Sequence, residues 1–90
     1  LADRRNPELI HDVQPRIPNS IPEGLSFSAT VEYWSEADGT TSGARMSRSS
    51  GARKLDQEIL SAAAKWKYNP AVQNSVARRV TMKRTFKINT

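Results

Sequence analysis

The sequence contains no cysteine and a single histidine, His11. Without cysteine the chain has neither a disulfide framework nor a thiolate metal site, and this absence is compatible with an oxidising compartment. The lone histidine lies in a proline-rich stretch, which offers no support for a serine–histidine catalytic pair. The aspartates are scattered over turns and helix starts and form no cluster with metal-ligand spacing. We therefore expect no enzyme, no cofactor and no metal.

Long hydrophobic runs and aromatic residues are also scarce. No run approaches the roughly 18 apolar residues of a membrane span, and no signal-peptide pattern opens the chain. Two phenylalanines, two tyrosines and two tryptophans are present among the 90 residues, so each is expected to matter for packing in one small domain. Because the chain begins at Leu1 rather than at a methionine, we expect a C-terminal fragment whose anchor and targeting signals lie upstream.

Acidic residues are fewer than basic ones, and the formal net charge is +5. This balance is compatible with nucleic acid, an anionic membrane or an acidic protein as partner, and selects none of them. The basic residues gather around one loop and along the last predicted strand: Arg45, Arg48, Arg53, Lys54, Arg78, Arg79, Lys83, Arg84 and Lys87. A nucleic-acid reader would interleave aromatics with these charges, and only Phe86 does so. The alternative is that the charges guard an exposed sheet edge against aggregation.

The clearest predicted element is an amphipathic helix that begins near residue 55. Its apolar residues recur with helical spacing on one face, at Leu55, Ile59, Ala62, Ala63 and Trp66. Pro70 disfavours helical conformation for the residue before it. We therefore predict that the helix ends near Lys67 or Tyr68. Acidic residues in the first turns and lysines in the last would suit the helix dipole.

Alternation of polar and apolar residues predicts strands on both sides of this helix. Residues 25–33 alternate strictly and predict a strand with one buried face, with Trp34 on the opposite face. The Asp38-Gly39 pair predicts a hairpin turn before a weaker returning strand over 40–47. After the helix, we predict a loop over 71–75 and a long strand over 76–88, whose apolar face is interrupted by Arg78 and Arg84. The simplest architecture is a three-stranded antiparallel sheet with one helix on one face, an α+β fold in the order β-β-α-β.

Four of the five prolines lie in residues 1–23, which predicts an extended, irregular lead-in with at most one helical turn, over Pro7–Asp12.

The last strand is the surface of most functional interest. If it lies at a sheet edge, its unpaired N–H and C=O groups can accept an extended peptide by strand addition. Its positive charge would favour a peptide with acidic residues. The same edge could instead pair with a second copy of the chain and form a homodimer.

Several motifs, taken in order, resemble the C-terminal periplasmic domain of TonB, the energy transducer of Gram-negative bacteria. Trp66-Lys-Tyr-Asn-Pro70 is similar to the W-x-Y-x-P signature that closes the long helix of that family. Phe86-Lys-Ile-Asn89 is similar to the F-x-I-N end of its last strand. Gln14-Pro15-Arg16-Ile17-Pro18 resembles its Q-P-x-Y-P segment, with isoleucine in place of tyrosine. A short first helix usually follows, and the proline-interrupted residues 19–23 predict one turn or no helix there.

The resemblance implies a function that the residues alone leave open. In the family, the domain captures the TonB box of an outer-membrane transporter, and this peptide adds as a strand to the edge of the last strand. Force derived from the proton gradient, through the ExbB–ExbD complex, then remodels the transporter and admits iron chelates (siderophores) or vitamin B12. By residue match, the expected partner-binding residues are Gln14, Pro15, Arg16, Arg79, Thr81, Lys83 and Thr85. Trp66 and Tyr68 are expected in the core.

The resemblance also implies a location and a division of the chain. Residues 1–13 would be an extended or partly ordered linker, and residues 14–90 the TonB-like C-terminal domain. The domain would lie in the periplasm, anchored in the inner membrane by an N-terminal segment outside this sequence. Two alternatives stay open: a TolA-like domain or specialised TonB paralogue that serves another envelope protein, and a small basic nucleic-acid-binding domain. The TonB-like hypothesis predicts no nucleic-acid partner.

Overall fold

The computed structural model describes residues 3–90, and its central element is the strictly alternating strand. This strand, β3 (Ser26–Ser35), lies between β4 (Thr41–Arg48) and β8 (Val80–Asn89) in an antiparallel sheet of order β4-β3-β8. Odd-numbered residues of β3 face the core, where Ala29, Val31 and Tyr33 are at most 3% exposed. Even-numbered residues, including Trp34, lie on the outer face, as the alternation predicts.

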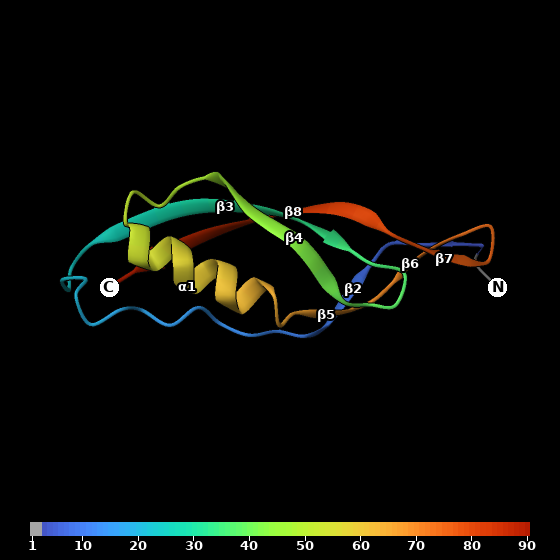
Figure 1. Cartoon of the computed structure of the whole chain (residues 1–90), viewed down its shortest axis with the longest axis horizontal. Coiled ribbons are helices and arrows are strands. Elements are labelled where there is room, and N and C mark those ends of the chain that lie inside the picture. Colours follow the sequence, from blue (N-terminus) through green and yellow to red (C-terminus); the bar gives the residue numbers. More distant parts are fainter. Residues whose placement is uncertain (1–2) are drawn as a thin grey trace.

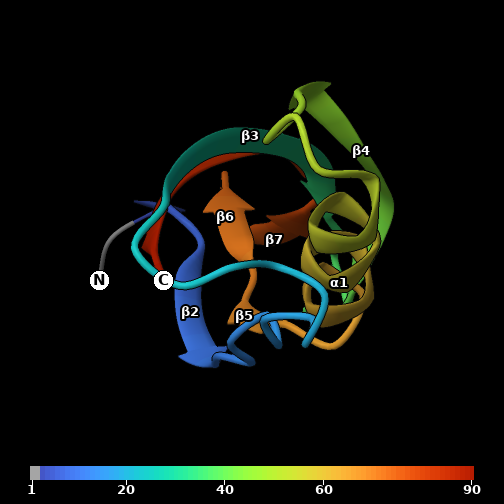
Figure 2. The same ribbon diagram turned by 90° about the vertical axis from the view of Figure 1, so that its left-hand side faces the viewer.

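The helix α1 (Arg53–Ala63) packs across the inner face of β3 and β4 (Figures 1 and 2). Its buried residues are Leu55, Ile59, Ala62 and Ala63, which confirms the predicted face. The predicted end near Lys67 or Tyr68 is wrong, because the helix stops at Ala63. Its last turn holds no basic residue, so the lysines do not complement the helix dipole. Lys67 instead forms an antiparallel β-bridge with Thr40, which lies in a distant part of the sequence. This backbone pairing takes the place of another helical turn.

Two further sheets, which were not predicted, lie toward one end of the central sheet, at the right in Figure 1. The first has the order β1-β6-β7, and the second pairs β2 with β5, all antiparallel. Their strands are β1 (Arg4–Arg5), β2 (Glu8–His11), β5 (Lys67–Asn69), β6 (Ala71–Gln73) and β7 (Val76–Arg78). The helical turn predicted over Pro7–Asp12 is therefore wrong. The β-β-α-β order describes β3, β4, α1 and β8, and is incomplete as a description of the whole arrangement.

The predicted loop over 71–75 is also wrong, since only its last two residues form a turn. Asn74 and Ser75 both have positive φ, 52° and 64°, as a two-residue hairpin turn that matches strand twist requires. This turn joins β6 to β7, and the single residue Arg79 then separates β7 from β8. The predicted strand over 76–88 is thus divided into a short hairpin strand and a long strand of the central sheet.

An extended segment between β2 and β3 covers the part of the inner face that α1 leaves open (Figure 2). Val13 and Ile21 from this segment pack against the core. The peptide N–H of Ile21 donates to the Pro18 oxygen at 3.1 Å, so this stretch forms a turn and no helix. The core is therefore closed by a helix on one side and by extended chain on the other.

Trp66 lies at the centre of that core and is fully buried. Its ring meets Tyr33 edge-to-face at 5.2 Å and stacks on Phe86 of β8 at 5.8 Å between centroids. Its indole Nε1–H donates to the Val13 oxygen at 2.8 Å, which ties the extended segment to the core. The buried hydroxyls of Tyr33 and Tyr68 bond to each other, and burial together with that bond raises the pKa of Tyr33. Both signature aromatics, Trp66 and Tyr68, are core residues, as predicted.

Candidate functional site

β8 is an edge strand, and within residues 3–90 its one partner is β3. The two strands pair over ten consecutive residues without a register shift. At the end of the ladder, the Thr90 N–H donates to the Leu25 oxygen at 2.8 Å and the Thr90 oxygen accepts from Gly24 N–H at 2.9 Å. Because the pairs of an antiparallel ladder alternate, the even-numbered residues of β8 point their backbone groups at β3. The odd-numbered residues present theirs to the free edge.

The opposite edge of the central sheet, β4, is less suited to accept another strand. Its pairing with β3 shifts register twice. Gly43, in the middle of β4, has φ 61°, in the left-handed region that favours glycine. Such bulges bend a strand and interrupt its row of unpaired backbone groups. Of the two edges of this sheet, β8 is therefore the regular one.

Three of the residues expected to bind a partner lie on this regular edge. Thr81, Lys83 and Thr85 are exposed and odd-numbered, so their backbone groups face the free edge and their side chains lie on the outer face of the sheet. Arg79 precedes β8 and is engaged within the protein. Its guanidinium forms an ion pair with Glu36 at 3.0 Å and lies 3.9 Å over the ring of Trp34.

The other expected contact residues, Gln14, Pro15 and Arg16, lie in the extended segment. Gln14 and Arg16 line a shallow hollow of about 120 Å³ together with Glu58 of α1 and Lys65, which lies just beyond the end of α1. In the described part of the chain, no hydrogen bond or ion pair joins this segment to Thr81, Lys83 or Thr85. Gln14 instead donates to the Asp12 carboxylate at 2.9 Å.

Arg84, which interrupts the apolar face of the last strand, is the residue that connects β8 to the extended segment. Its guanidinium makes two bonds to the Asp12 carboxylate, at 3.0 and 3.1 Å. It also lies over the rings of Trp66 and Phe86, 4.5 and 4.9 Å from their centroids. Asp12 was not expected at the site. The break in alternation at Arg84 was the one sequence signal, and it does not identify a partner 72 positions away.

Replacing Asp12 with asparagine is expected to lower the free energy of unfolding by about 1 kcal/mol at pH 7, after allowing for solvent screening of a partly exposed pair. The bond to Arg84 holds the pKa of Asp12 below its ordinary value of 3.8. A depressed carboxyl pKa contributes stability above the unfolded pKa and loses it as the pH falls through the folded pKa. Urea unfolding of both proteins at several pH values should therefore show the difference shrinking below about pH 4. A difference that does not change with pH would contradict an ionic role for Asp12.

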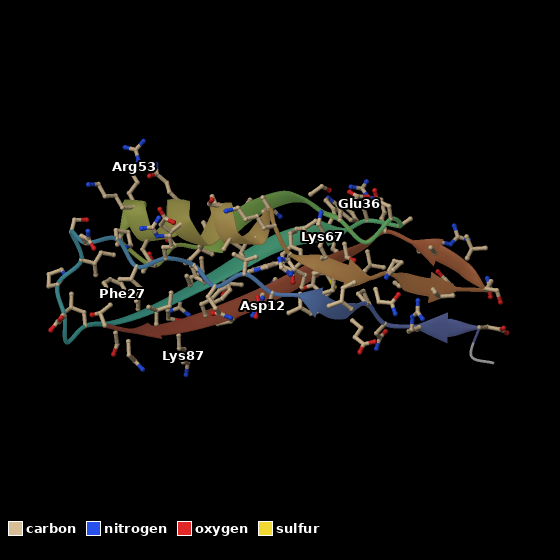
Figure 3. All side chains as sticks on the ribbon, turned by 90° about the horizontal axis from the view of Figure 1, so that it is seen from below. Asp12, Phe27, Glu36, Arg53, Lys67 and Lys87 are labelled. Carbon is tan, nitrogen blue, oxygen red and sulfur yellow. The ribbon has the colours of Figure 1, made fainter. Side chains whose placement is uncertain are left out.

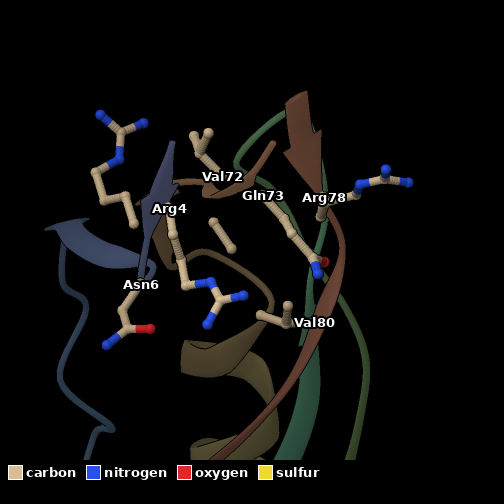
Figure 4. Close-up of a pocket in the computed structure, with 8 residues that line it drawn as sticks. Arg4, Asn6, Val72, Gln73, Arg78 and Val80 are labelled. Carbon is tan, nitrogen blue, oxygen red and sulfur yellow. The ribbon is translucent and has the colours of Figure 1, made fainter. Parts of the chain in front are cut away.

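A second hollow, of about 320 Å³, lies beside the sheet formed by β1, β6 and β7 (Figure 4). It is lined by Arg4, Arg5, Asn6, Ala71, Val72, Gln73, Arg78 and Val80. Arg4 extends toward Gln73 and Val80, whereas Arg78 extends away from them (Figure 4). The Arg5 guanidinium donates to the Asn69 side-chain oxygen in β5 at 3.1 Å and to the Pro70 backbone oxygen at 3.3 Å. Because the guanidinium groups diverge, they do not converge on one anion, and β8 is the stronger candidate.

Residues 3–90 contain no group of three or more histidine, cysteine, aspartate or glutamate side chains that could hold a metal ion. The helix in this part of the chain, α1, is too short and too polar to cross a membrane.

The fold and the edge strand define a class of small α+β domain with one helix, one extended segment across the inner face and one regular free strand. A family model described as Gram-negative bacterial TonB protein C-terminal matches residues 19–89, and the chain belongs to this family. The resemblance drawn from the motifs is thereby confirmed. The family comprises periplasmic domains of energy transducers, which are not enzymes. The search of curated proteins found no match.

Proposed function

We propose that this domain binds the TonB box of an outer-membrane transporter by strand addition to β8 and transmits force to it. The observation that carries the proposal is the free, ten-residue edge of β8, paired with β3 without a register shift. Main-chain bonds along such an edge provide affinity, and the flanking side chains provide selectivity. Thr81, Lys83 and Thr85 supply backbone groups at its centre.

Strand addition suits a protein that pulls on its partner, because several parallel hydrogen bonds share the load. In this proposal, an inner-membrane anchor precedes the sequence, and the ExbB–ExbD complex supplies force from the proton gradient. The pull would reach β8 through the contacts that the extended segment makes with the core, Asp12 with Arg84 and Val13 with Trp66. The cargo would be a siderophore or vitamin B12. Gln14, Pro15 and Arg16 would contact the transporter beside the added strand.

Amide NMR spectra with and without a TonB-box peptide test the proposal. We expect shifts concentrated between Arg78 and Lys87, and slower hydrogen exchange on binding at the odd-numbered amides of Thr81, Lys83 and Thr85. These N–H groups point to the free edge and gain partners only when a strand is added. Even-numbered amides of β8 already bond to β3 and should change little.

Two N-methylated peptides provide the control. Methylation of alternate amides removes donors from one side of the added strand only. The peptide methylated on the side that faces β8 should not bind, whereas methylation of the other side should be tolerated. Equal binding of both peptides would overturn strand addition. Protection of the same amides without peptide, increasing with protein concentration, would instead indicate that β8 pairs with a second copy of the chain.

A further inference from the structure

Building on the proposed strand addition, we infer that β8 selects a segment with two acidic side chains four residues apart and apolar side chains between them. Lys83 and Lys87 would pair with the two acids on the outer face of the sheet. The half-buried apolar residues of β8 would pack against the intervening side chains on the inner face. This pattern specifies the side chains of the peptide in addition to its backbone contacts.

The two lysines are exposed and lie on the same face of β8. In the part of the chain that the structure describes, neither forms an ion pair. Lys83 lies across from Glu32 in the register, but the Glu32 carboxylate bonds to Arg45 at 3.3 Å. Lys87 lies across from the uncharged Ser28, and its side chain extends away from the molecule (Figure 3). Both ammonium groups are therefore available to a partner.

The spacing of the acids follows from strand geometry. Four residues span about 13 Å along a strand, and side chains four apart lie on one face. Two acids at this spacing in the added strand would each lie beside one lysine. With a spacing of three, the second acid would fall on the inner face, near Phe86 and the carboxylate of Asp12. Burial and like charge both disfavour an acid there.

The inner face of the edge favours apolar side chains. Met82, Phe86 and Ile88 are partly buried there and pack against the core. Arg84 lies among them, but Asp12 already neutralises its charge. A strand added beside β8 would extend this surface, and apolar side chains would remove it from water. The inner positions of the peptide therefore require no charge.

Three peptides of equal length test the inference: one with acids spaced by four, one with the same residues permuted to a spacing of three, and one with both acids replaced by their amides. The first should bind most tightly, about 4- to 25-fold more than the neutral peptide, since each exposed ion pair contributes a factor of about two to five. The advantage should shrink in high salt, which screens exposed charges. Dissociation constants from NMR titration provide the comparison.

Variants of the domain assign the effect to the lysines. Lys87→Gln and Lys83→Gln should each weaken binding of the acidic peptide by about two- to fivefold. Binding of the neutral peptide should stay unchanged. The loss should be larger for Lys87, because Glu32 lies across from Lys83. Lys54→Gln, an exposed lysine on α1, is the matched control and should leave binding unchanged.

The possible failures are distinguishable. Equal affinity for all three peptides would overturn the inferred selection of acids spaced by four. If the odd-numbered β8 amides are still protected from hydrogen exchange in that case, strand addition itself is supported. Tighter binding of the peptide with acids spaced by three would also overturn the inferred selection. Protection by none of the peptides would overturn the proposed function itself.

Discussion

Replacing Trp66 with alanine is expected to lower the free energy of unfolding by about 3–5 kcal/mol. The side chain is fully buried, and its removal leaves a cavity between Tyr33 and Phe86, whose rings it contacts. The Val13 oxygen would also lose its donor. A domain of this size is stable by about 5–13 kcal/mol, so the variant loses a large part of its stability. Phe86 belongs to β8, and the edge would lose support from beneath.

Urea unfolding followed by circular dichroism measures this loss. Trp66→Phe is the matched variant, because it keeps an aromatic ring between Tyr33 and Phe86 but removes the donor to Val13. We expect it to lose less, about 1–3 kcal/mol. Trypsin should also cleave it faster after Arg16, since the extended segment loses its anchor. A loss below about 1 kcal/mol for Trp66→Ala would contradict its central place in the core.

Replacing Gly39 with alanine is expected to lower the free energy of unfolding by about 2–4 kcal/mol. Gly39 has φ 88°, and an added Cβ would lie 2.3 Å from the Tyr68 carbonyl oxygen. The backbones of the two residues are also hydrogen-bonded, because the Tyr68 N–H donates to the Gly39 oxygen at 2.8 Å. Alanine would therefore combine an unfavourable backbone conformation with displacement of the hairpin turn from β5.

Gly51→Ala separates the two contributions. Gly51 has nearly the same φ, 91°, but an added Cβ would meet nothing within 4 Å. It should lose only the conformational part, about 1–2 kcal/mol. The difference between the two variants in urea unfolding then measures the close approach of the turn to β5. Equal losses would show that the contact with Tyr68 has little energetic weight.

The elements predicted correctly are those whose pattern is local. The alternation of residues 25–33 predicted β3 and its buried face, and the helical spacing from Leu55 to Ala63 predicted the buried face of α1. The Asp38-Gly39 pair predicted the turn between β3 and β4. In each case one buried face repeats over several residues, so a short window of sequence contains the whole signal.

The short strands could not be predicted in this way. Strands of two to four residues, such as β1 and β2, are too short for a period to show. β1 and β2 exist because they pair with chain about 60 or more positions away, Arg4 with Gln73 and Glu8 with Asn69. The same pairing ends α1 early, because residues 67–69 form β5 against β2. Helical periodicity continues to Trp66, but long-range backbone bonds outweigh it.

For the candidate site, the amino-acid pattern alone predicts that the last strand alternates, with Thr81, Lys83 and Thr85 on one face and an arginine interrupting the other. Three features follow from the folded arrangement and not from the pattern: β8 is an edge strand, these odd-numbered residues present their backbone groups to the free edge, and Arg84 pairs with Asp12. Alternation follows from the backbone geometry of a single strand. Strand order and ion pairing depend on which distant segments come together in the core, and no short stretch of sequence contains that information.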